Sequence, residues 1–322
     1  CCTVRQDLVQ VLKDLAKSKS KFDAVIIETT GLADPAPVAQ TFFVDDEIQG
    51  LYRLDGIVTM VDVKHAMQHF DEVKPEGVEN ESIEQVAFAD RVLLNKIDLV
   101  DEATITAVER RVKSINSSVG LFKTTHSKID PKLLLNINAF SLDRVVAMDP
   151  EFLDVDGEHQ HDDAVSSVSF KFDGEVNVAK MQDFISKLLM EKGTDLFRYK
   201  GLLSVKGMQS KFLFQGVHML FQGAFDDAYS WRPNQTRECR FVFIGRNLDK
   251  KLLEDGFLAC KVTTDLRFNV GDAVLASCEG GFQRGNVIAI WDDGNPYRIK
   301  LAKSGIEVWA PEDDNAYIKP AP

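Results

Sequence analysis

The sequence lacks a Gly-x-x-x-x-Gly-Lys-Ser/Thr run, the loop with which many nucleotide-binding proteins cradle phosphate groups. It also has no apolar stretch near the ~18 residues that a membrane-spanning helix needs, so we expect no membrane partner. Positive charge is scarce, because 38 Lys and Arg stand against 50 Asp and Glu, for a net charge of −12. A nucleic-acid surface normally needs a basic patch, so this balance argues against a nucleic-acid partner.

Cysteine is also infrequent, and the five present are Cys1, Cys2, Cys239, Cys260 and Cys278. An odd, scattered set is typical of a reducing compartment rather than of a disulfide framework. The start carries no signal peptide or transit segment, and it begins with Cys1 instead of Met. We therefore expect a protein of the cytoplasm or another reducing compartment, an organelle included, and we interpret the first residue as lying inside a domain.

The length of 322 residues is enough for two or three domains. The composition, 44% hydrophobic and 27% charged, is typical of a globular protein. In residues 1–150, apolar runs at 22–27, 57–61 and 92–94 predict buried strands. Apolar residues at helical spacing predict helices at 3–17, 81–89, 102–115 and 131–138. Strands that alternate with helices predict an α/β fold with a parallel sheet, whose ligands bind at the carboxyl ends of the strands.

Two further units follow this α/β domain. Residues 151–163 form an acidic linker that contains His159 and His161, which can capture a metal loosely or can simply be solvated. Residues 164–262 predict an α+β domain with an antiparallel sheet covered on one face. Its strands are expected at 168–172, 196–205, 212–221 and 240–244, with helices at 176–189 and 248–258.

The last unit, residues 265–322, has short apolar runs separated by Gly, Asp, Asn and Pro, which predicts a small antiparallel β-barrel. Its aromatic residues Trp291, Tyr297 and Trp309 can form a ligand-binding cage, or they can pack a small core. Packing of the core is the simpler interpretation.

The run Asn95-Lys96-Ile97-Asp98 directly follows the apolar strand at 92–94. In such a run the Asp carboxylate accepts hydrogen bonds from two guanine nitrogens, while the Asn and the Lys stem hold the ring. Adenine presents the wrong donors and leaves polar groups unpaired, so the site rejects it. Three fixed residues arise by chance in roughly one chain of this length in twenty-five, so the run needs support from other motifs.

Glu28-Thr29-Thr30-Gly31 directly follows the predicted strand at 22–27 and supplies such support. A carboxylate there can hold Mg²⁺ through water or orient an attacking water, and Gly31 lets the backbone approach a γ-phosphate. An ordinary strand-to-loop junction is the alternative. Together with the later guanine run, in this order, the motif favours descent from a GTPase.

Candidate metal ligands are fewer. Cys1 and Cys2 can both ligate Zn²⁺ or Co²⁺ through their thiolates, although two ligands leave a tetrahedron incomplete. The alternative is that they act as small hydrophobic residues. His65 and His69, four residues apart, are interpreted as neighbours on a surface helix, because no third ligand is apparent.

Taken together, these runs resemble the CobW family of P-loop GTPases, the zinc-regulated metallochaperone group. The opening Cys1-Cys2-Thr3-Val4-Arg5-Gln6-Asp7-Leu8 resembles that family's Cys-x-Cys-Cys motif and its continuation, without the first Cys-x. Residues 22–35 are similar to its Walker B segment, and Asn95-Lys96-Ile97-Asp98 to its guanine motif. Residues 195–201, 214–218 and 241–248 resemble the family's C-terminal domain. The likeness covers about residues 1–262, and the barrel resembles Tudor-like modules instead.

The resemblance implies an incomplete P-loop GTPase domain, a CobW C-terminal domain and an appended small barrel. It implies GTP with Mg²⁺ as cofactor, slow hydrolysis, and a nucleotide-gated transfer of Zn²⁺ or Co²⁺ to a client metalloprotein. By position in the motifs, it assigns catalysis to Glu28, nucleotide binding to Gly31, Asn95, Lys96 and Asp98, and metal binding to Cys1 and Cys2.

The parent protein is thus expected to be a GTP hydrolase, whereas these 322 residues, without the P-loop lysine, are expected to be inactive alone. A non-catalytic protein-interaction module and a metal-buffering protein are the other two interpretations. The sequence leaves the oligomeric state open. The linker departs from many family members, in which this loop is strongly histidine-rich.

Overall fold

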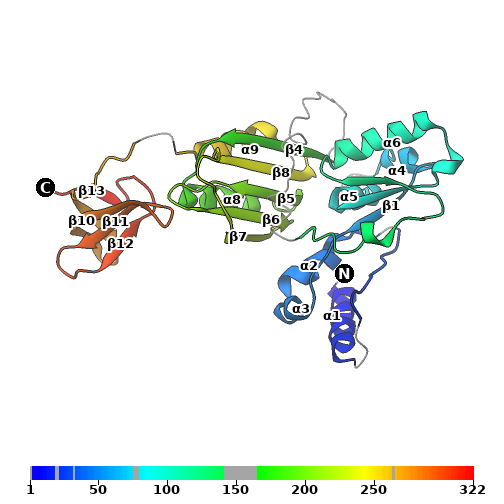
Figure 1. The fold of residues 1–322 in the computed structure, drawn as a ribbon, viewed down its shortest axis with the longest axis horizontal. Helices are drawn as coiled ribbons and strands as arrows, with labels where there is room; N and C mark the ends of the chain where they lie inside the picture. Colours follow the sequence, from blue (N-terminus) through cyan, green and yellow to red (C-terminus); the bar gives the residue numbers. More distant parts are fainter. Residues whose placement is uncertain (1, 19–21, 32, 75–79, 141–164, 263–264) are drawn as a thin grey trace.

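The computed structural model describes residues 2–18, 22–31, 33–74, 80–140, 165–262 and 265–322. These residues form three β-sheets that follow one another along an elongated molecule (Figure 1). The first sheet is parallel and the other two are antiparallel. The predicted order of an α/β unit, an α+β unit and a small barrel is confirmed.

The parallel sheet has the order β1-β2-β3. Its strands are β1 (Val58–Asp62), β2 (Arg91–Asn95) and β3 (Gly120–Lys123). The helices beside it are α4 (Ala66–Phe70), α5 (Glu81–Phe88) and α6 (Glu102–Ile115). The apolar run of the central strand β2 is at most 2% exposed, as expected for a strand covered on both faces.

Helix α6 has the bounds that the sequence predicts. Its N-cap Asp101 accepts a hydrogen bond from the Thr104 amide at 2.8 Å, and Ile105, Val108 and Val112 are buried on one face. Cap and apolar spacing therefore agree on where this helix begins and which side it buries.

The predicted strand at residues 22–27 is wrong. The run has no strand pairing, and the Ile26 side chain is 85% exposed. A strand needs a neighbour that accepts and donates its backbone hydrogen bonds. Among the residues described here, no strand lies beside this run, so its apolar composition does not suffice.

The predicted helix at 131–138 is also wrong, because only the short 3₁₀ turn η2 (Pro131–Leu133) forms. Asn136 and Asn138 have φ angles of 55° and 50°, which a right-handed helix cannot accommodate. The Asp55 carboxylate instead accepts hydrogen bonds from the amides of Ile137, at 3.0 Å, and Asn138, at 2.8 Å.

Three helices near the N-terminus pack against one another (Figure 1). They are α1 (Cys2–Lys17), α2 (Ala36–Val44) and α3 (Asp46–Leu51). Ala36, the first residue of α2, also joins the core of the parallel sheet. Helix α1 confirms the prediction for residues 3–17, whereas α2 and α3 were not predicted. The hydroxyl of Tyr52 donates to the Leu12 carbonyl at 2.9 Å, and Lys13 pairs with Glu47 at 2.7 Å.

The second sheet has the order β4-β8-β5-β6-β7. Its strands are β4 (Val165–Asp173), β5 (Leu196–Leu203), β6 (Ser210–Val217), β7 (Leu220–Ser230) and β8 (Glu238–Arg246). Helices α8 (Val178–Lys192) and α9 (Lys250–Ala259) supply the rest of its core, where the Phe241 and Phe257 rings meet. The single strand predicted at 212–221 is a hairpin instead, because His218 turns the chain with a φ of 50°.

The third sheet has the order β12-β11-β10-β9-β13. Its strands are β9 (Ala273–Cys278), β10 (Gly281–Asp292), β11 (Asn295–Leu301), β12 (Glu307–Ala310) and β13 (Ile318–Pro320). Tyr297 is fully buried, and its hydroxyl accepts a hydrogen bond from the Phe268 amide at 3.2 Å. Tyr297 therefore packs the core, and the alternative of an aromatic cage is wrong.

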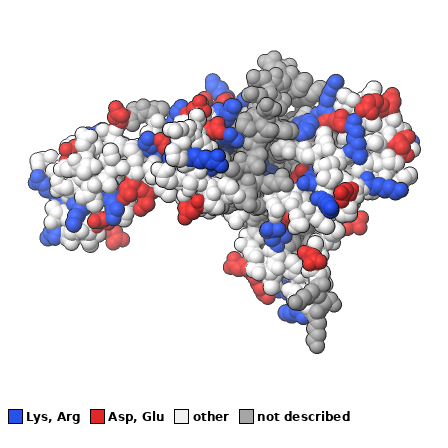
Figure 2. All heavy atoms as spheres, in the orientation of Figure 1, with Lys and Arg blue, Asp and Glu red and all other residues white. Residues whose placement is uncertain are grey.

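No helix among the described residues has the length and apolar character to cross a membrane. Charged side chains of both signs are scattered over the face seen in Figure 2.

Candidate functional site

Asn95 ends β2 and is only 8% exposed. Its Oδ1 accepts hydrogen bonds from the Ser127 amide at 2.9 Å and the Thr124 hydroxyl at 3.1 Å, and its Nδ2 donates to Ser127 Oγ at 3.1 Å. The side-chain amide thus joins the end of β2 to the loop that follows β3. Asn95 braces this edge of the sheet.

Lys96 turns the chain immediately after the strand. Its backbone has φ 65° and ψ 31°, a left-handed conformation that costs a non-glycine residue about 1–2 kcal/mol. Its side chain reaches the end of the neighbouring strand β1, where Nζ donates to Asp62 Oδ2 at 2.7 Å. Asp62 is the strand partner of Asn95, so the contact closes the gap between the ends of β1 and β2.

The Asp62 carboxylate has two further partners. His65 Nδ1 lies 3.0 Å from Oδ2, and the Lys64 amide donates to Oδ1 at 3.1 Å. Burial alone raises the pKa of Asp62, but the hydrogen bonds from Lys96 and His65 outweigh burial and lower the pKa to about 2. Asp62 therefore remains a carboxylate at neutral pH and holds its cationic neighbour.

Asp98 differs from these two residues. It lies on the 3₁₀ turn η1 (Ile97–Leu99), it is exposed, and its carboxylate has no hydrogen bond or ion pair with any residue that the structure describes. Its oxygens can therefore accept hydrogen bonds from a ligand with two adjacent N–H donors. The loop of residues 95–98 thus has an amide held by two neighbours, a lysine paired with Asp62 and an open carboxylate.

Glu28 lies in an exposed segment without regular secondary structure, and Gly31 lies in the turn that follows, also exposed. The Gln85 side chain on α5 donates to the carbonyls of Gly31 at 3.1 Å and Ala33 at 2.9 Å, which ties the segment to the helix. A Cβ at Gly31 would meet nothing within 4 Å among the described atoms. No hydrogen bond or ion pair in the described part of the chain joins Glu28 to the loop with Asp98.

The predicted metal ligands are not placed by the structure. Cys1, His159 and His161 lie outside the described residues, and the side chain of Cys2, at the start of α1, is not described either. Within the described ranges, no group of three or more His, Cys, Asp or Glu side chains can hold a metal ion. His65 and His69 are both exposed at α4, as the sequence predicts.

The remaining cysteines are poor ligand candidates. Burial raises the pKa of the Cys239 thiol to about 12 and that of Cys260 to about 11. Both side chains are buried in the core of the second sheet. A metal ligand must be a thiolate, so these two thiols serve packing instead.

Sequence reasoning missed Asp62, Thr124 and Ser127. Asp62 was detectable, because it directly follows the apolar run at 57–61 just as Asn95 follows the run at 92–94. Carboxyl ends of neighbouring parallel strands meet at one edge, so the two residues had to be close. Thr124 and Ser127 follow the four-residue strand β3, whose short sequence gave no strand prediction.

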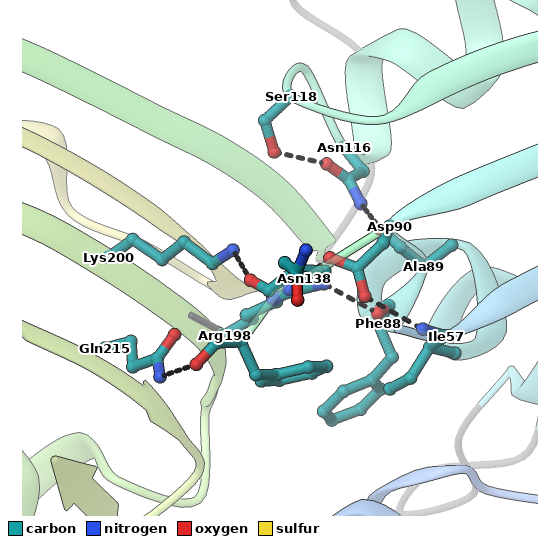
Figure 3. Close-up of polar contacts among 12 residues, drawn as sticks. Ile57, Phe88, Ala89, Asp90, Asn116, Ser118, Asn138, Arg198, Lys200 and Gln215 are labelled. Atoms are coloured by element: carbon teal, nitrogen blue, oxygen red, sulfur yellow. Dashed lines mark hydrogen bonds and ion pairs between the residues drawn. The ribbon is translucent and has the colours of Figure 1, made fainter. Parts of the chain in front are cut away.

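At the amino ends of its strands, opposite to Asn95, the parallel sheet contacts the second sheet (Figure 3). Arg198 on β5 pairs with Asp90 and donates from Nη1 to the Phe88 carbonyl at 3.0 Å. The second carboxylate oxygen of Asp90 accepts from the Ile57 amide at 2.9 Å. The Arg198 and Asp90 side chains are 6% and 8% exposed, so this is a buried ion pair between two sheets.

The contacts around this pair extend the junction (Figure 3). The Gln215 amide donates to the Phe140 carbonyl at 2.6 Å, and the Arg198 guanidinium lies 4.6 Å from the centre of the Phe140 ring. Phe88 stacks on Phe197 with ring centres 5.7 Å apart. Residues of both sheets belong to one buried apolar core, so the junction is packed.

Comparison with known proteins gives two family matches. The family described as "CobW/HypB/UreG, nucleotide-binding domain" matches residues 1–123, and the one described as "Cobalamin synthesis protein cobW C-terminal domain" matches residues 165–261.

Individual proteins agree with these matches. The zinc chaperone YjiA of Escherichia coli is 34% identical over 263 residues, which are 80% of this chain and 78% of YjiA. The zinc-regulated GTPase metalloprotein activator 1 of Schizosaccharomyces pombe is 29% identical, over 78% of this chain and 67% of its own. The crystal structure of the Zn(II)-bound YjiA GTPase superposes with a TM-score of 0.66 at 30% identity, covering 79% of this chain and 76% of that one.

Proposed function

The chain belongs to the CobW family, and from that premise we propose that it is a GTP-dependent metallochaperone. In this proposal, GTP is bound with Mg²⁺, and the nucleotide state gates the transfer of Zn²⁺, or of the related Co²⁺, to a client metalloprotein. The names of two relatives, a zinc chaperone and a zinc-regulated GTPase metalloprotein activator, support this choice over other GTPase functions.

The observation that carries the proposal is the open carboxylate of Asp98 beside a braced Asn95 and a held Lys96. Guanine presents two adjacent N–H donors on one edge, and a carboxylate with free acceptors matches both. Adenine has no such pair of donors there, and an unmatched carboxylate would lose water without a partner.

The other roles follow from position in the family motifs. Glu28 would orient water or hold Mg²⁺ through water, and Gly31 would lie beside the γ-phosphate. Cys1 and Cys2 would bind the cargo metal as thiolates. Because the thiols must release their protons on binding, the metal affinity should fall at acidic pH. The exposure of Glu28, on a segment tied to α5 by Gln85, leaves its carboxylate accessible for this role.

For the 322 residues on their own, we expect weak guanine-nucleotide binding, weak zinc binding and no hydrolysis. The sequence has no Gly-x-x-x-x-Gly-Lys-Ser/Thr loop, and that loop supplies the lysine and hydroxyl that hold phosphates and Mg²⁺. The loop of residues 95–98, which we call the base-reading loop, is present and can be tested by itself.

Exchanging Asp98 for Asn tests the reading of the base. The side-chain amide introduced by Asp98→Asn would offer a donor where guanine also presents one, so the affinity for GDP should fall at least about tenfold. Xanthosine diphosphate presents a carbonyl at that edge and should bind the variant better than GDP does. Affinities can be measured from amide chemical shifts in a ¹⁵N–¹H TROSY titration.

The matched control is Asp183→Asn, which removes an exposed carboxylate from α8 in the other sheet's domain and should leave both affinities unchanged. Equal binding of GDP and ADP by the wild type would contradict the proposal. It would favour a protein-interaction module, in which the parallel sheet is structural.

A further inference from the structure

Asp62 belongs to β1 and not to the base-reading loop at residues 95–98, yet its carboxylate accepts a hydrogen bond from Lys96 of that loop. We infer that Asp62 is a positioning residue for guanine-nucleotide binding and acts through Lys96. This inference rests on the proposed function, because it assigns a task to the same loop.

The orientation of the Asp62 carboxylate is fixed by its own surroundings. Asp62 is paired in register with Asn95, and the next amide, that of Val63, donates to the Asn95 carbonyl at 3.1 Å. Lys64 N and His65 Nδ1 contact the two carboxylate oxygens at 3.1 Å and 3.0 Å. The acceptor is therefore in place independently of the lysine.

The Lys96 side chain, unlike the Asp62 carboxylate, is not fixed by other neighbours among the described residues. It is 47% exposed and has four rotatable bonds, so an unpaired lysine loses rotamer entropy when it is ordered. Its hydrogen bond to Asp62, 2.7 Å long and between two charged groups, is of the stronger kind. Ordering before the ligand arrives reduces the entropy that binding must overcome.

The two neighbouring strands thus brace the loop from both sides. The loop after β3 holds Asn95 through Thr124 and Ser127, while the end of β1 holds Lys96 through Asp62. Asp98 alone is left open for the base. Asp62 would therefore hold Lys96 in the orientation in which the lysine contacts the nucleotide.

The test is a double-mutant cycle on GDP binding by the full 322-residue chain. Asp62→Asn removes the charge and keeps the size, and the GDP dissociation constant should rise about five- to tenfold. In the Lys96→Ala background, the same exchange should change the constant less than about twofold, because the residue through which Asp62 acts is absent.

Asp71→Asn is the control. Asp71 directly follows α4, its side chain is 63% exposed, and it reaches Arg111 only at 4.0 Å. This exchange should leave the GDP affinity unchanged. If Asp62→Asn binds GDP as the wild type does, or if its effect persists undiminished in the Lys96→Ala background, the inference is overturned.

Amide hydrogen exchange in the nucleotide-free protein gives a second measurement. Exchange at residues 96–99 should accelerate in Asp62→Asn and in Lys96→Ala, and remain unchanged in Asp71→Asn. If GDP shifts no amide of the wild type, the proposed function of this chain fails. In that case only the amide hydrogen-exchange rates test the positioning of Lys96 by Asp62, and an unaltered rate in Asp62→Asn overturns the inference.

Discussion

Replacing Arg198 by Met should weaken the junction between the parallel sheet and the second sheet. The exchange removes the ion pair to Asp90, the hydrogen bond to the Phe88 carbonyl and the contact with the Phe140 ring. It keeps an apolar side chain of similar length, so the loss of packing is small. What remains is a buried carboxylate whose strongest partner has gone.

The magnitude follows from these contacts. Breaking a buried ion pair by removing one partner costs about 3–5 kcal/mol. The hydrogen bond from the Ile57 amide to Asp90 remains and offsets about 1 kcal/mol of this cost. Loss of the ring contact adds about 0.5–1 kcal/mol. We therefore expect a loss of about 2.5–5 kcal/mol in the free energy of unfolding.

Two probes of urea unfolding can locate the loss. The three tryptophans, Trp231, Trp291 and Trp309, all lie outside the parallel-sheet unit, whereas far-ultraviolet circular dichroism reports on every unit. In the variant, the dichroism transition should move down by about 1 M urea. It should also separate from the fluorescence transition, because the parallel sheet loses its support first.

A cycle with Asp90→Asn measures the coupling directly. Each single exchange leaves one buried charge unpaired, so the double variant should be at least about 2 kcal/mol more stable than the sum of the two losses implies. Lys187→Met serves as control, because its pair with Glu191 is exposed and should contribute under about 0.5 kcal/mol. Additive losses, or a midpoint unchanged in Arg198→Met, would refute the reasoning.

Two further predictions concern titratable groups. Because the folded-state pKa of Asp62 is about 2, below its ordinary 3.8, its carboxylate stabilises the fold above about pH 4, and this stabilisation disappears as the pH falls toward 2. The unfolding free energies of wild type and Asp62→Asn should thus differ by about 1 kcal/mol at pH 7, after solvent screening, and converge near pH 2. Peptide-resolved iodoacetamide labelling of the native protein at pH 8 should modify the half-buried Cys278 well before Cys239 and Cys260, whose raised pKa values keep them protonated. Equal labelling rates would contradict the burial of these two thiols.

Sequence reasoning succeeded where local signals agreed with one another. The apolar residues at helical spacing within 102–115 predicted α6 without tertiary information, and the cap at Asp101 agrees with the start that this spacing gave. The run at 92–94 is apolar throughout and lies at the centre of its sheet. The position of Asn95 at the carboxyl end of β2 followed directly.

It failed where a neighbour decides the outcome. The run at 22–27 has strand composition, but only a pairing partner could have turned it into a strand. Residues 131–138 have helical spacing, but the Asp55 carboxylate, distant in sequence, captures two amides there. The bond between Lys96 and Asp62 likewise joins residues 34 positions apart, and neither belongs to the motif of the other.

The seam between the last two sheets has a consequence for how the chain can be divided. A Cβ added at Gly294, on the β10–β11 turn, would lie 3.3 Å from Val178 and 3.4 Å from Val205, so the turn closely approaches the second sheet's domain. Asn177 caps α8 at Lys180 and also donates to the Pro311 carbonyl at 3.0 Å. The family match ends at residue 261, before this contact begins. A shortened chain cut at that point would lose the turn beside Val178 and Val205 and the Pro311 carbonyl that the Asn177 side chain contacts. The homology boundary is thus not a physical boundary, and the barrel should be kept in any expression of the C-terminal half.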